Sequence, residues 1–336
     1  MNKQYLISGV VLIIAIAAVA LAFVLLQNDT SEDQTYNVTK EPFLWRIEGE
    51  NPSYLYGSIH LADEDILTLP DVVIEAVDDV DVVYTEVKLD IETQTRSAEL
   101  SMLSGGETLA DLLPQDVIDS LDSYLAPMGI NHTAFSQFKI WAVATTLVLL
   151  EEIENLLEYP PLDQYIWNLA TSKGKETGGI ETVEEQIGIF DNFTIAEQIE
   201  MLSNALDSLE EYASAGQSVT GETIDAYLQG DLEILQDLSL SDYDENDPFD
   251  VKFKSRILTD RNYNMTQRIS QLLTDNPDTR YFFTIGAAHY YGDDGLITLL
   301  ENEGYMITRV EFSECEPCDC DSGEVEIDNR CYVPYE

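Results

Sequence analysis

Two short motifs in this sequence could bring imidazole side chains together. Only three histidines occur among the 336 residues, and two of them stand in the same local context. Gly57–His60 (Gly-Ser-Ile-His) follows the apolar run Tyr54–Tyr56, and Gly286–His289 (Gly-Ala-Ala-His) follows the run Tyr281–Ile285. Glycine at the end of a strand permits close backbone approach, and ligand sites of α/β proteins collect at strand ends. If the two runs are neighbouring strands, His60 and His289 meet at one end of a sheet. The third histidine, His132, precedes a helix and is expected at the surface or in a cap.

A carboxylate near the end of a third apolar run strengthens this interpretation. The segment Asp81–Val87 is rich in β-branched residues and predicts a strand in which Val82, Tyr84 and Glu86 share one face. A carboxylate in such a place needs a cation, a metal or a hydrogen-bond donor. Two imidazoles and one carboxylate are a common ligand set for a catalytic divalent ion. Glu86 is then either the third ligand or the general base that takes a proton from water. The alternatives are a structural salt bridge for Glu86 and ordinary core or capping positions for the two histidines.

The elements that must position these residues follow the order strands, helices, strands. Two apolar runs around Asn51-Pro52 predict a β-hairpin, and 180–189 is expected to be a short strand that enters a helix. Apolar residues at helical spacing predict helices over 71–80, 116–126, 134–157, 162–172, 195–215, 221–238, 249–273 and 295–303. Strands are also expected over 281–285 and 306–312, near the end of the folded domain. We therefore expect an α/β fold with α+β character, in which a central β-sheet built from N- and C-terminal strands is covered by a large, mostly helical middle region.

The charge of the chain excludes nucleic acid as a partner. There are 16 basic against 64 acidic residues, which gives a formal net charge of −48, yet 45% of the residues are apolar. Eighteen Tyr and 11 Phe are too much core-forming material for a disordered acidic chain. Binding to phosphate needs clustered Lys and Arg, and adsorption to an anionic lipid surface needs them as well. The acidic excess therefore lies on the surface of a folded protein that does not bind nucleic acid.

The N-terminal segment predicts attachment to a membrane. Leu6–Leu26 carries no charged residue and, as a helix, would span about 30 Å, one hydrocarbon thickness. Lys3 precedes it and acidic sequence follows, so the positive-inside rule puts the N-terminus in the cytoplasm and the main domain outside the cell membrane. A signal peptide cleaved near Ala18–Ala20 is the alternative. The expected organisation is a single-pass anchor (1–26), a polar tether (27–42), a folded domain (43–312) and an acidic tail (313–336).

All four cysteines lie in that tail, at Cys315, Cys318, Cys320 and Cys331. Disulfide bonds in an oxidising exterior are favoured over a zinc knot, because no histidine accompanies the cysteines. The connectivity cannot be read from the sequence.

Several further motifs occur in a fixed order along the chain: Leu44–Ile47, Ser53–His60, Leu69-Pro70, Tyr84–Glu86, Leu162-Asp163, Gly174–Gln186, Gly230–Leu232, Arg261–Met265 and Phe282–Tyr290. Together they resemble the TraB/PrgY/GumN family, which includes the Tiki proteases, over residues 43–312. The second histidine motif reads Gly-Ala-Ala-His where Gly-Ala-Gly-His is frequent in the family. The resemblance implies a metal-dependent hydrolase fold related to the erythromycin esterase and ChaN-like proteins.

The resemblance also implies roles for individual residues. The two histidines of the family correspond to His60 and His289, its glutamate to Glu86 and its arginine to Arg261, while Glu181 falls at a second glutamate of the family. Arg261 either stabilises negative charge on a tetrahedral intermediate or pairs with Glu181 or Glu86. The expected function is that of a membrane-anchored, extracytoplasmic hydrolase that cuts peptides or secreted proteins with water activated by a divalent ion (Mn, Co, Fe or Zn). The alternative, implied by PrgY-type members, is a regulator that binds a peptide or pheromone without cleaving it.

Overall fold

The structure of the chain is a computed structural model that describes residues 38–239, 243–313, 320, 324–327 and 330–335. The expected membrane anchor and most of the tether lie outside the described residues. Within the described part of the chain, no helix combines the length and the apolar character that crossing a bilayer requires.

A mixed six-stranded sheet with the strand order β5-β4-β6-β2-β1-β7 forms the centre of the fold. Its strands are β1 (Leu44–Ile47), β2 (Ser53–Ser58), β4 (Val82–Thr85), β5 (Glu176–Gly179), β6 (Tyr281–Gly286) and β7 (Ile307–Arg309). The strands β2, β6, β4 and β5 run parallel, whereas β1 is antiparallel to both β2 and β7. The expected hairpin is β1–β2, and the expected neighbours β2 and β6 are paired. The carboxyl ends of β2, β6 and β4 therefore meet at the same edge of the sheet.

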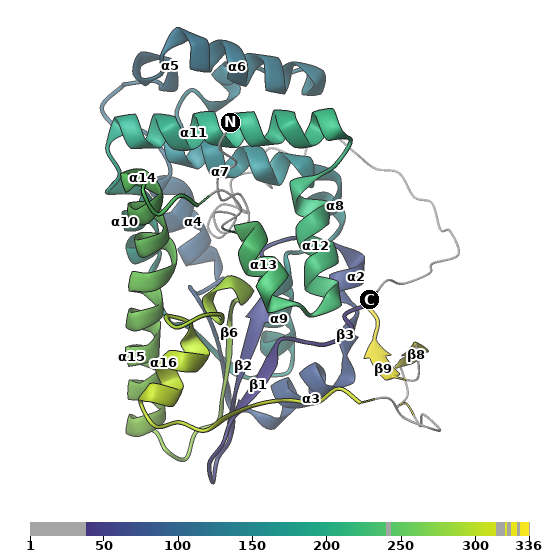
Figure 1. Cartoon of the computed structure of the whole chain (residues 1–336). Helices are drawn as coiled ribbons and strands as arrows, with labels where there is room; N and C mark the ends of the chain where they lie inside the picture. The colour runs from purple at the N-terminus through teal and green to yellow at the C-terminus, as the bar shows by residue number, and fades with distance from the viewer. Residues whose placement is uncertain (1–37, 240–242, 314–319, 321–323, 328–329, 336) are drawn as a thin grey trace.

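Helices surround this sheet (Figure 1). In the first half of the chain they are α2 (Glu64–Leu67), α3 (Asp71–Asp79), α4 (Ile91–Leu100), α5 (Leu109–Leu112), α6 (Gln115–Leu125), α7 (Ile140–Glu151), α8 (Ile153–Glu158) and α9 (Leu162–Ser172). The second half adds α10 (Val183–Asp191), α11 (Ile195–Ala215), α12 (Val219–Gln229), α13 (Leu232–Ser239), α14 (Pro248–Lys254), α15 (Asp260–Asp275) and α16 (Leu296–Asn302). Helices α5, α6, α7 and α11 stack as a layer above the sheet in Figure 1, while α9 packs on β4 and β6. The α/β fold class with a helical covering is thus confirmed.

Helix α7 is the most deeply buried of the helices in this upper layer. Every side chain from Ile140 to Leu150 is buried, as expected for an apolar helix too short to span a bilayer. Removal of this apolar surface from water is a major source of the stability of the fold.

The expected helix over 134–157 is interrupted. A short 3₁₀ turn, η2 (His132–Phe135), is followed by a turn at 136–137 and an isolated bridge from Phe138 to Met102 before α7 begins. A second break, at Glu152, separates α7 from α8. The reason for the first break is tertiary: the amide of Leu103 donates to the carbonyl of Gln137, and the amide of Lys139 donates to the carbonyl of Ser101. These bonds engage backbone groups that a continuous helix would need for itself.

Three other segments differ in detail from the expectations. The expected helix over 221–238 is divided into α12 and α13 at Gly230, whose φ of 75° ends α12. The strand expected within 180–189 lies earlier, as β5, and the helix α10 begins only at Val183. The expected helix over 249–273 consists of α14, a π-helical turn η3 (Ser255–Thr259) and α15. π-turns of this kind are frequent at functional sites, and this one ends just before Arg261.

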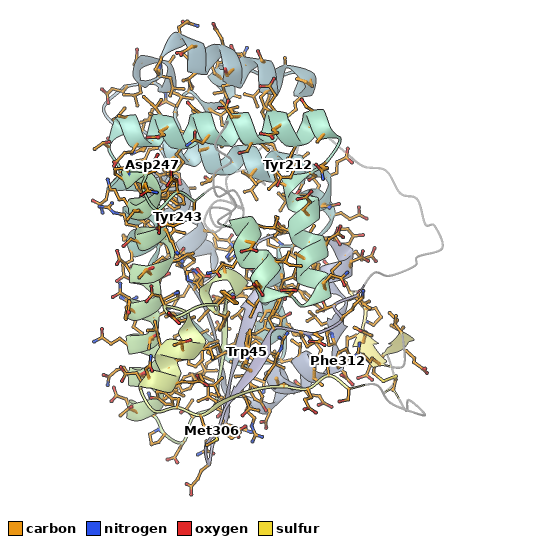
Figure 2. The ribbon with its side chains drawn as sticks, in the orientation of Figure 1. Trp45, Tyr212, Tyr243, Asp247, Met306 and Phe312 are labelled. Atoms are coloured by element: carbon orange, nitrogen blue, oxygen red, sulfur yellow. A yellow bond between two sulfur atoms is a disulfide. The ribbon has the colours of Figure 1, made fainter. Side chains whose placement is uncertain are left out.

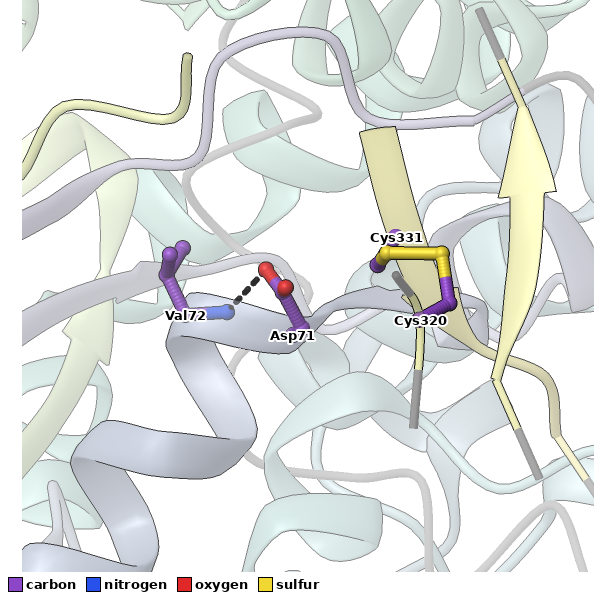
Figure 3. Close-up of a disulfide and its surroundings, with 4 residues drawn as sticks. All are labelled: Asp71, Val72, Cys320 and Cys331. Atoms are coloured by element: carbon purple, nitrogen blue, oxygen red, sulfur yellow. Dashed lines mark hydrogen bonds between the residues drawn. A yellow bond between two sulfur atoms is a disulfide. The ribbon is translucent and has the colours of Figure 1, made fainter. Parts of the chain in front are cut away.

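A second, small sheet joins the C-terminal tail to the domain. It contains β3 (Leu69–Pro70), β9 (Arg330–Val333) and β8 (Val325–Ile327), in that order reading across the sheet. A disulfide joins Cys320 to Cys331 close to the start of α3, where the Asp71 carboxylate accepts from the amide of Val72 (Figure 3). The other two cysteines of the tail lie outside the described residues.

Candidate functional site

The ends of three neighbouring strands bring the expected site residues together. In the parallel pair β2–β6, Ser58 lies opposite Gly286. His60 follows the end of β2, His289 lies in the 3₁₀ turn η4 (Ala287–His289) directly after β6, and Glu86 follows β4. Nε2 of His60 is 3.8 Å from Oε1 of Glu86, and Nε2 of His289 is 4.0 Å from the same oxygen. The two imidazoles therefore face one carboxylate from either side.

A carboxylate behind His60 sets the orientation of its ring. Nδ1 of His60 lies 2.6 Å from Oδ2 of Asp163, at the start of α9. Nε2 then points into the site, where it is buried without a hydrogen-bond partner in the described part of the chain. Burial alone would lower the pKa of His60, but the carboxylates of Asp163 and Glu86 raise it to about 10. A carboxylate on Nδ1 with Nε2 left free is the usual arrangement behind a metal-bound histidine.

The side-chain amide of Asn262 orients the ring of His289 in the same way. Nδ1 of His289 lies 2.5 Å from Oδ1 of Asn262, whose Nδ2 donates to the carbonyl of Asp294 over 2.8 Å. This network assigns the proton of the neutral ring to Nδ1 and leaves the Nε2 lone pair facing inward. Burial and the adjacent guanidinium of Arg261 lower the pKa of His289 to about 3. His289 is therefore neutral at physiological pH.

An aromatic stack fixes the backbone that carries His289. The rings of Trp45, in β1, and Tyr290 are stacked with their centroids 4.8 Å apart, and Trp45 is labelled on the sheet in Figure 2. The hydroxyl of Tyr290 also donates to the carbonyl of Tyr56 over 3.2 Å. These contacts tie the residue after His289 to both strands of the hairpin.

Arg261 links the two glutamates that the sequence singled out. Its Nη2 forms ion pairs with Glu86 and, over 2.6 Å, with Oε2 of Glu181. Nε2 of Gln186 donates to both carboxylates, over 3.1 and 2.9 Å, and the amide of Gly286 donates to Oε1 of Glu86 over 2.7 Å. Burial alone would raise the pKa of Glu86, but Arg261 and the imidazoles hold it well below the ordinary value. Glu86 is thus a buried, ionised carboxylate.

The absence of a side chain at Gly286 keeps the centre of the site open. A Cβ there would lie 3.1 Å from Oε1 of Glu86, 3.5 Å from Nε2 of His60 and 3.6 Å from Cδ2 of His289. A methyl group would therefore occupy the space that the three side chains face.

The donor set fits a divalent ion. His60 offers a buried nitrogen without a hydrogen-bond partner in the described part of the chain, and an ion that binds there displaces its proton. Glu86 offers a carboxylate oxygen, and both rings are held with Nε2 inward. The donor atoms of His60, Glu86 and His289 are not yet all within 4.8 Å of one another, and Nη1 of Arg261 lies 3.0 Å from Nε2 of His289. For all three residues to bind one ion, the two imidazoles must move closer to each other, and the hydrogen bond between His289 and Arg261 must break. Glu181 forms an ion pair with Arg261, so it lies beside the three donor residues and is not counted among them.

The structure brings the residues predicted from the sequence together, and it adds the side chains that orient them: Asp163, Asn262 and Gln186. Asp163 and Gln186 lay within motifs that carried the family resemblance, but no role was assigned to them. Asn262 had a usable signal, since it follows Arg261 directly. His132 pairs with Asp122 over 2.9 Å in η2 and does not belong to the site.

Comparisons with known proteins agree with the motifs. A profile of the TraB/PrgY/gumN family matches residues 43–309. "Metalloprotease TIKI1" of Danio rerio is 27% identical in an alignment that covers 83% of this chain and 67% of that protein. "Metalloprotease TIKI2" of Xenopus tropicalis is 25% identical over 79% of this chain and 59% of that protein. "Uncharacterized protein YbaP" of Shigella flexneri is 23% identical over 76% of this chain and 89% of that protein. The chain thus spans about two thirds or less of these two Tiki relatives, and no solved structure matches it.

Proposed function

Because this chain belongs to the TraB/PrgY/gumN family, we propose that it is a metal-dependent hydrolase that cleaves peptides or secreted proteins. The observation that carries the proposal is the placement of two imidazoles around one carboxylate: Nε2 of His60 and Nε2 of His289 face Oε1 of Glu86 at 3.8 and 4.0 Å. Relatives named metalloproteases support the peptide bond as the target.

Each residue of the site has a distinct part in this proposal. His60, His289 and Glu86 would hold the ion, and Asp163 and Asn262 keep the rings turned toward it. A bound divalent ion supplies a Lewis acid that polarises the scissile carbonyl and makes water more acidic. If Glu86 does not bind the ion, its ionised carboxylate is the group that takes the proton from water.

Arg261 would be an auxiliary cation. It is buried and held by two glutamates, so it needs no reorganisation when negative charge develops beside it. Its role as a charge stabiliser and its structural pairing are therefore compatible.

The proposed location is the outer face of the cell membrane. Its support is the apolar run Leu6–Leu26 with Lys3 before it and acidic sequence after it. The bond between Cys320 and Cys331 fits an oxidising exterior. Protease added to intact cells should digest residues 43–312 if the main domain is outside, and protection of that domain would contradict the proposed orientation.

The test of the activity is turnover of a peptide library by the purified full chain, with chelator and with Mn, Co, Fe or Zn restored. Chelation should abolish cleavage and an added ion should restore it, whereas His60→Ala and His289→Ala should lose both bound ion and cleavage. His132→Ala is the matched control, because that histidine pairs with Asp122 outside the site. Stoichiometric peptide binding without turnover, unaffected by chelator, would instead favour the non-catalytic peptide-binding regulator.

A further inference from the structure

A cavity of about 330 Å³ opens beside the candidate site, between α10 and the η3–α15 part of the long helix. Glu181 and Arg261 line this cavity, and they are the same ion pair that adjoins Glu86. The volume lies at the lower end of the range of ligand pockets and suffices for a side chain or a chain end. A group held there would lie next to the residues that we propose to carry out hydrolysis.

Most of the other charges that line the cavity are paired within the protein. Nη2 of Arg268 lies 2.5 Å from Oε1 of Glu185, and Nε of Arg96 donates to Oε1 of Glu184 over 2.9 Å. These carboxylates and the Arg268 guanidinium are therefore largely neutralised before any ligand arrives.

Arg256, in η3, is the exception. In the described part of the chain it has no ion pair with a carboxylate, and its guanidinium lies over the ring of Phe193, 5.2 Å from the ring centroid. A cation–π contact of this kind uses none of the N–H donors of the guanidinium in a hydrogen bond to a carboxylate, and the planar fork loses little freedom when it binds one. The exposed Asp260 also lines the cavity, but no ion pair joins it to Arg256.

We infer that this cavity is a subsite for a carboxylate of the peptide substrate, which the guanidinium of Arg256 binds. The inference rests on the proposed function for the substrate class. The fork of an arginine matches a carboxylate with two parallel hydrogen bonds. The chain as a whole carries a net charge of −48, so an acidic peptide can bind only where a local cation offsets the repulsion, and Arg256 is such a cation in the cavity lining. The carboxylate comes either from an Asp or Glu side chain or from the C-terminus of the peptide.

The test measures binding by the metal-free full chain, in chelator, so that hydrolysis plays no part. Pools of fluorescein-labelled octapeptides carry Glu or Gln at one fixed position, and each pool is made with a C-terminal acid and a C-terminal amide. Fluorescence anisotropy should show a preference of about tenfold or more for a carboxylate in one of the two comparisons, as expected for a charge-assisted hydrogen-bonded pair. Preference for Glu over Gln identifies a side-chain carboxylate, and preference for acid over amide identifies the chain end.

Variants locate the preference. Arg256→Gln should remove it and Arg256→Lys should retain part of it, with thermal melting to confirm that both variants are folded. Arg280→Gln is the matched control: it also removes a paired arginine, but its partners Asp79 and Asp81 do not line this cavity. Equal binding of all four kinds of pool, or an unchanged preference in Arg256→Gln, would overturn the inference. A carboxylate preference without metal-dependent cleavage would contradict the proposed hydrolase alone, and cleavage without the preference would contradict the subsite alone.

Discussion

The guanidinium of Arg261 donates a hydrogen bond from Nη1 to Nε2 of His289 over 3.0 Å. Since Nδ1 of His289 carries the ring proton toward Asn262, Nε2 offers one lone pair. That lone pair can bind either Arg261 or a metal ion, so the two are linked by competition. The remaining bonds of Arg261, to Glu181 and Glu86, can keep the side chain in place when His289 leaves it.

Replacement of Arg261 should therefore have opposite effects on the metal-free and the metal-bound protein. Arg261→Gln breaks a buried ion-pair network and should lower the free energy of unfolding of the metal-free protein by about 3 kcal/mol or more. The same change frees His289 and both glutamates, so a divalent ion should bind about tenfold more tightly or better. Thermal unfolding with and without the ion, together with titration calorimetry, measures both effects. Arg96→Gln, which removes an exposed pair, should change the free energy of unfolding by less than about 1 kcal/mol. Weaker ion binding by Arg261→Gln would refute the competition.

A methyl group at position 286 should remove the ion without unfolding the domain. In Gly286→Ala the new Cβ lies 3.1 Å from Oε1 of Glu86 and 3.5 Å from Nε2 of His60, in the space between the donors. The backbone φ of Gly286 is −51°, which alanine adopts freely. We expect loss of ion binding by calorimetry and a circular dichroism spectrum like that of the parent. Gly188→Ala in α10 is the control, because its Cβ meets nothing within 4 Å; it should bind the ion normally. Normal ion binding by Gly286→Ala would place the ion elsewhere.

Loss of the carboxylate behind His60 should weaken ion binding without removing a ligand. Asp163→Ala leaves Nδ1 of His60 without its acceptor, and partners of this kind contribute about 10- to 100-fold to metal affinity. Asp163→Asn keeps an acceptor oxygen and should show a smaller loss. Calorimetric titration of both variants with one divalent ion gives the comparison. Affinity equal to that of the parent in Asp163→Ala would show that the ring of His60 needs no such support.

The two histidines should give the metal-free protein opposite pH dependences. The pKa of His60 is about 10 in the folded protein and about 6.5 when unfolded, so its contribution to stability is fully present below pH 6.5 and is lost as the pH rises toward 10. The pKa of His289 is about 3 when folded, so the unfolded chain takes up the proton first and stability falls as the pH drops from 6.5 toward 3. Stability in chelator should therefore peak near neutral pH.

Urea unfolding in chelator from pH 5 to pH 10 measures this profile. In the parent, His60 contributes at most about 1.4 kcal/mol per pH unit to the fall in the free energy of unfolding above neutral pH. His60→Gln should make this fall shallower. The acidic side should persist in that variant, since His289 is unchanged. If the free energy of unfolding of His60→Gln falls as steeply above neutral pH as that of the parent, other groups cause the loss of stability.

The sequence alone determined the types of most elements and named the residues that are candidates for the site. Apolar periodicity predicted the hairpin, the strand before His289 and the buried helix around Trp141, because local burial patterns follow from chain geometry. The repeated Gly-x-x-His motif could be recognised because each copy follows an apolar strand, and Glu86 because it was a carboxylate near the end of a predicted apolar strand. In the structure β4 ends at Thr85, so that Glu86 follows the strand. Five side chains expected at the site, including Arg261 and Glu181, do lie together.

Tertiary structure decided what those residues bind. The pairing of residues 101–103 with 137–139 interrupts a helix that periodicity favoured, and the register of β2, β6 and β4 brings His60, Glu86 and His289 to one edge of the sheet. Asp163 and His60 are 103 positions apart in the chain and 2.6 Å apart in space. A contact of that kind depends on how whole elements pack, and no local pattern encodes it. For the same reason, only the folded chain shows that His289 is bound to Arg261 and that, among the described residues, Arg256 has no ion pair with a carboxylate.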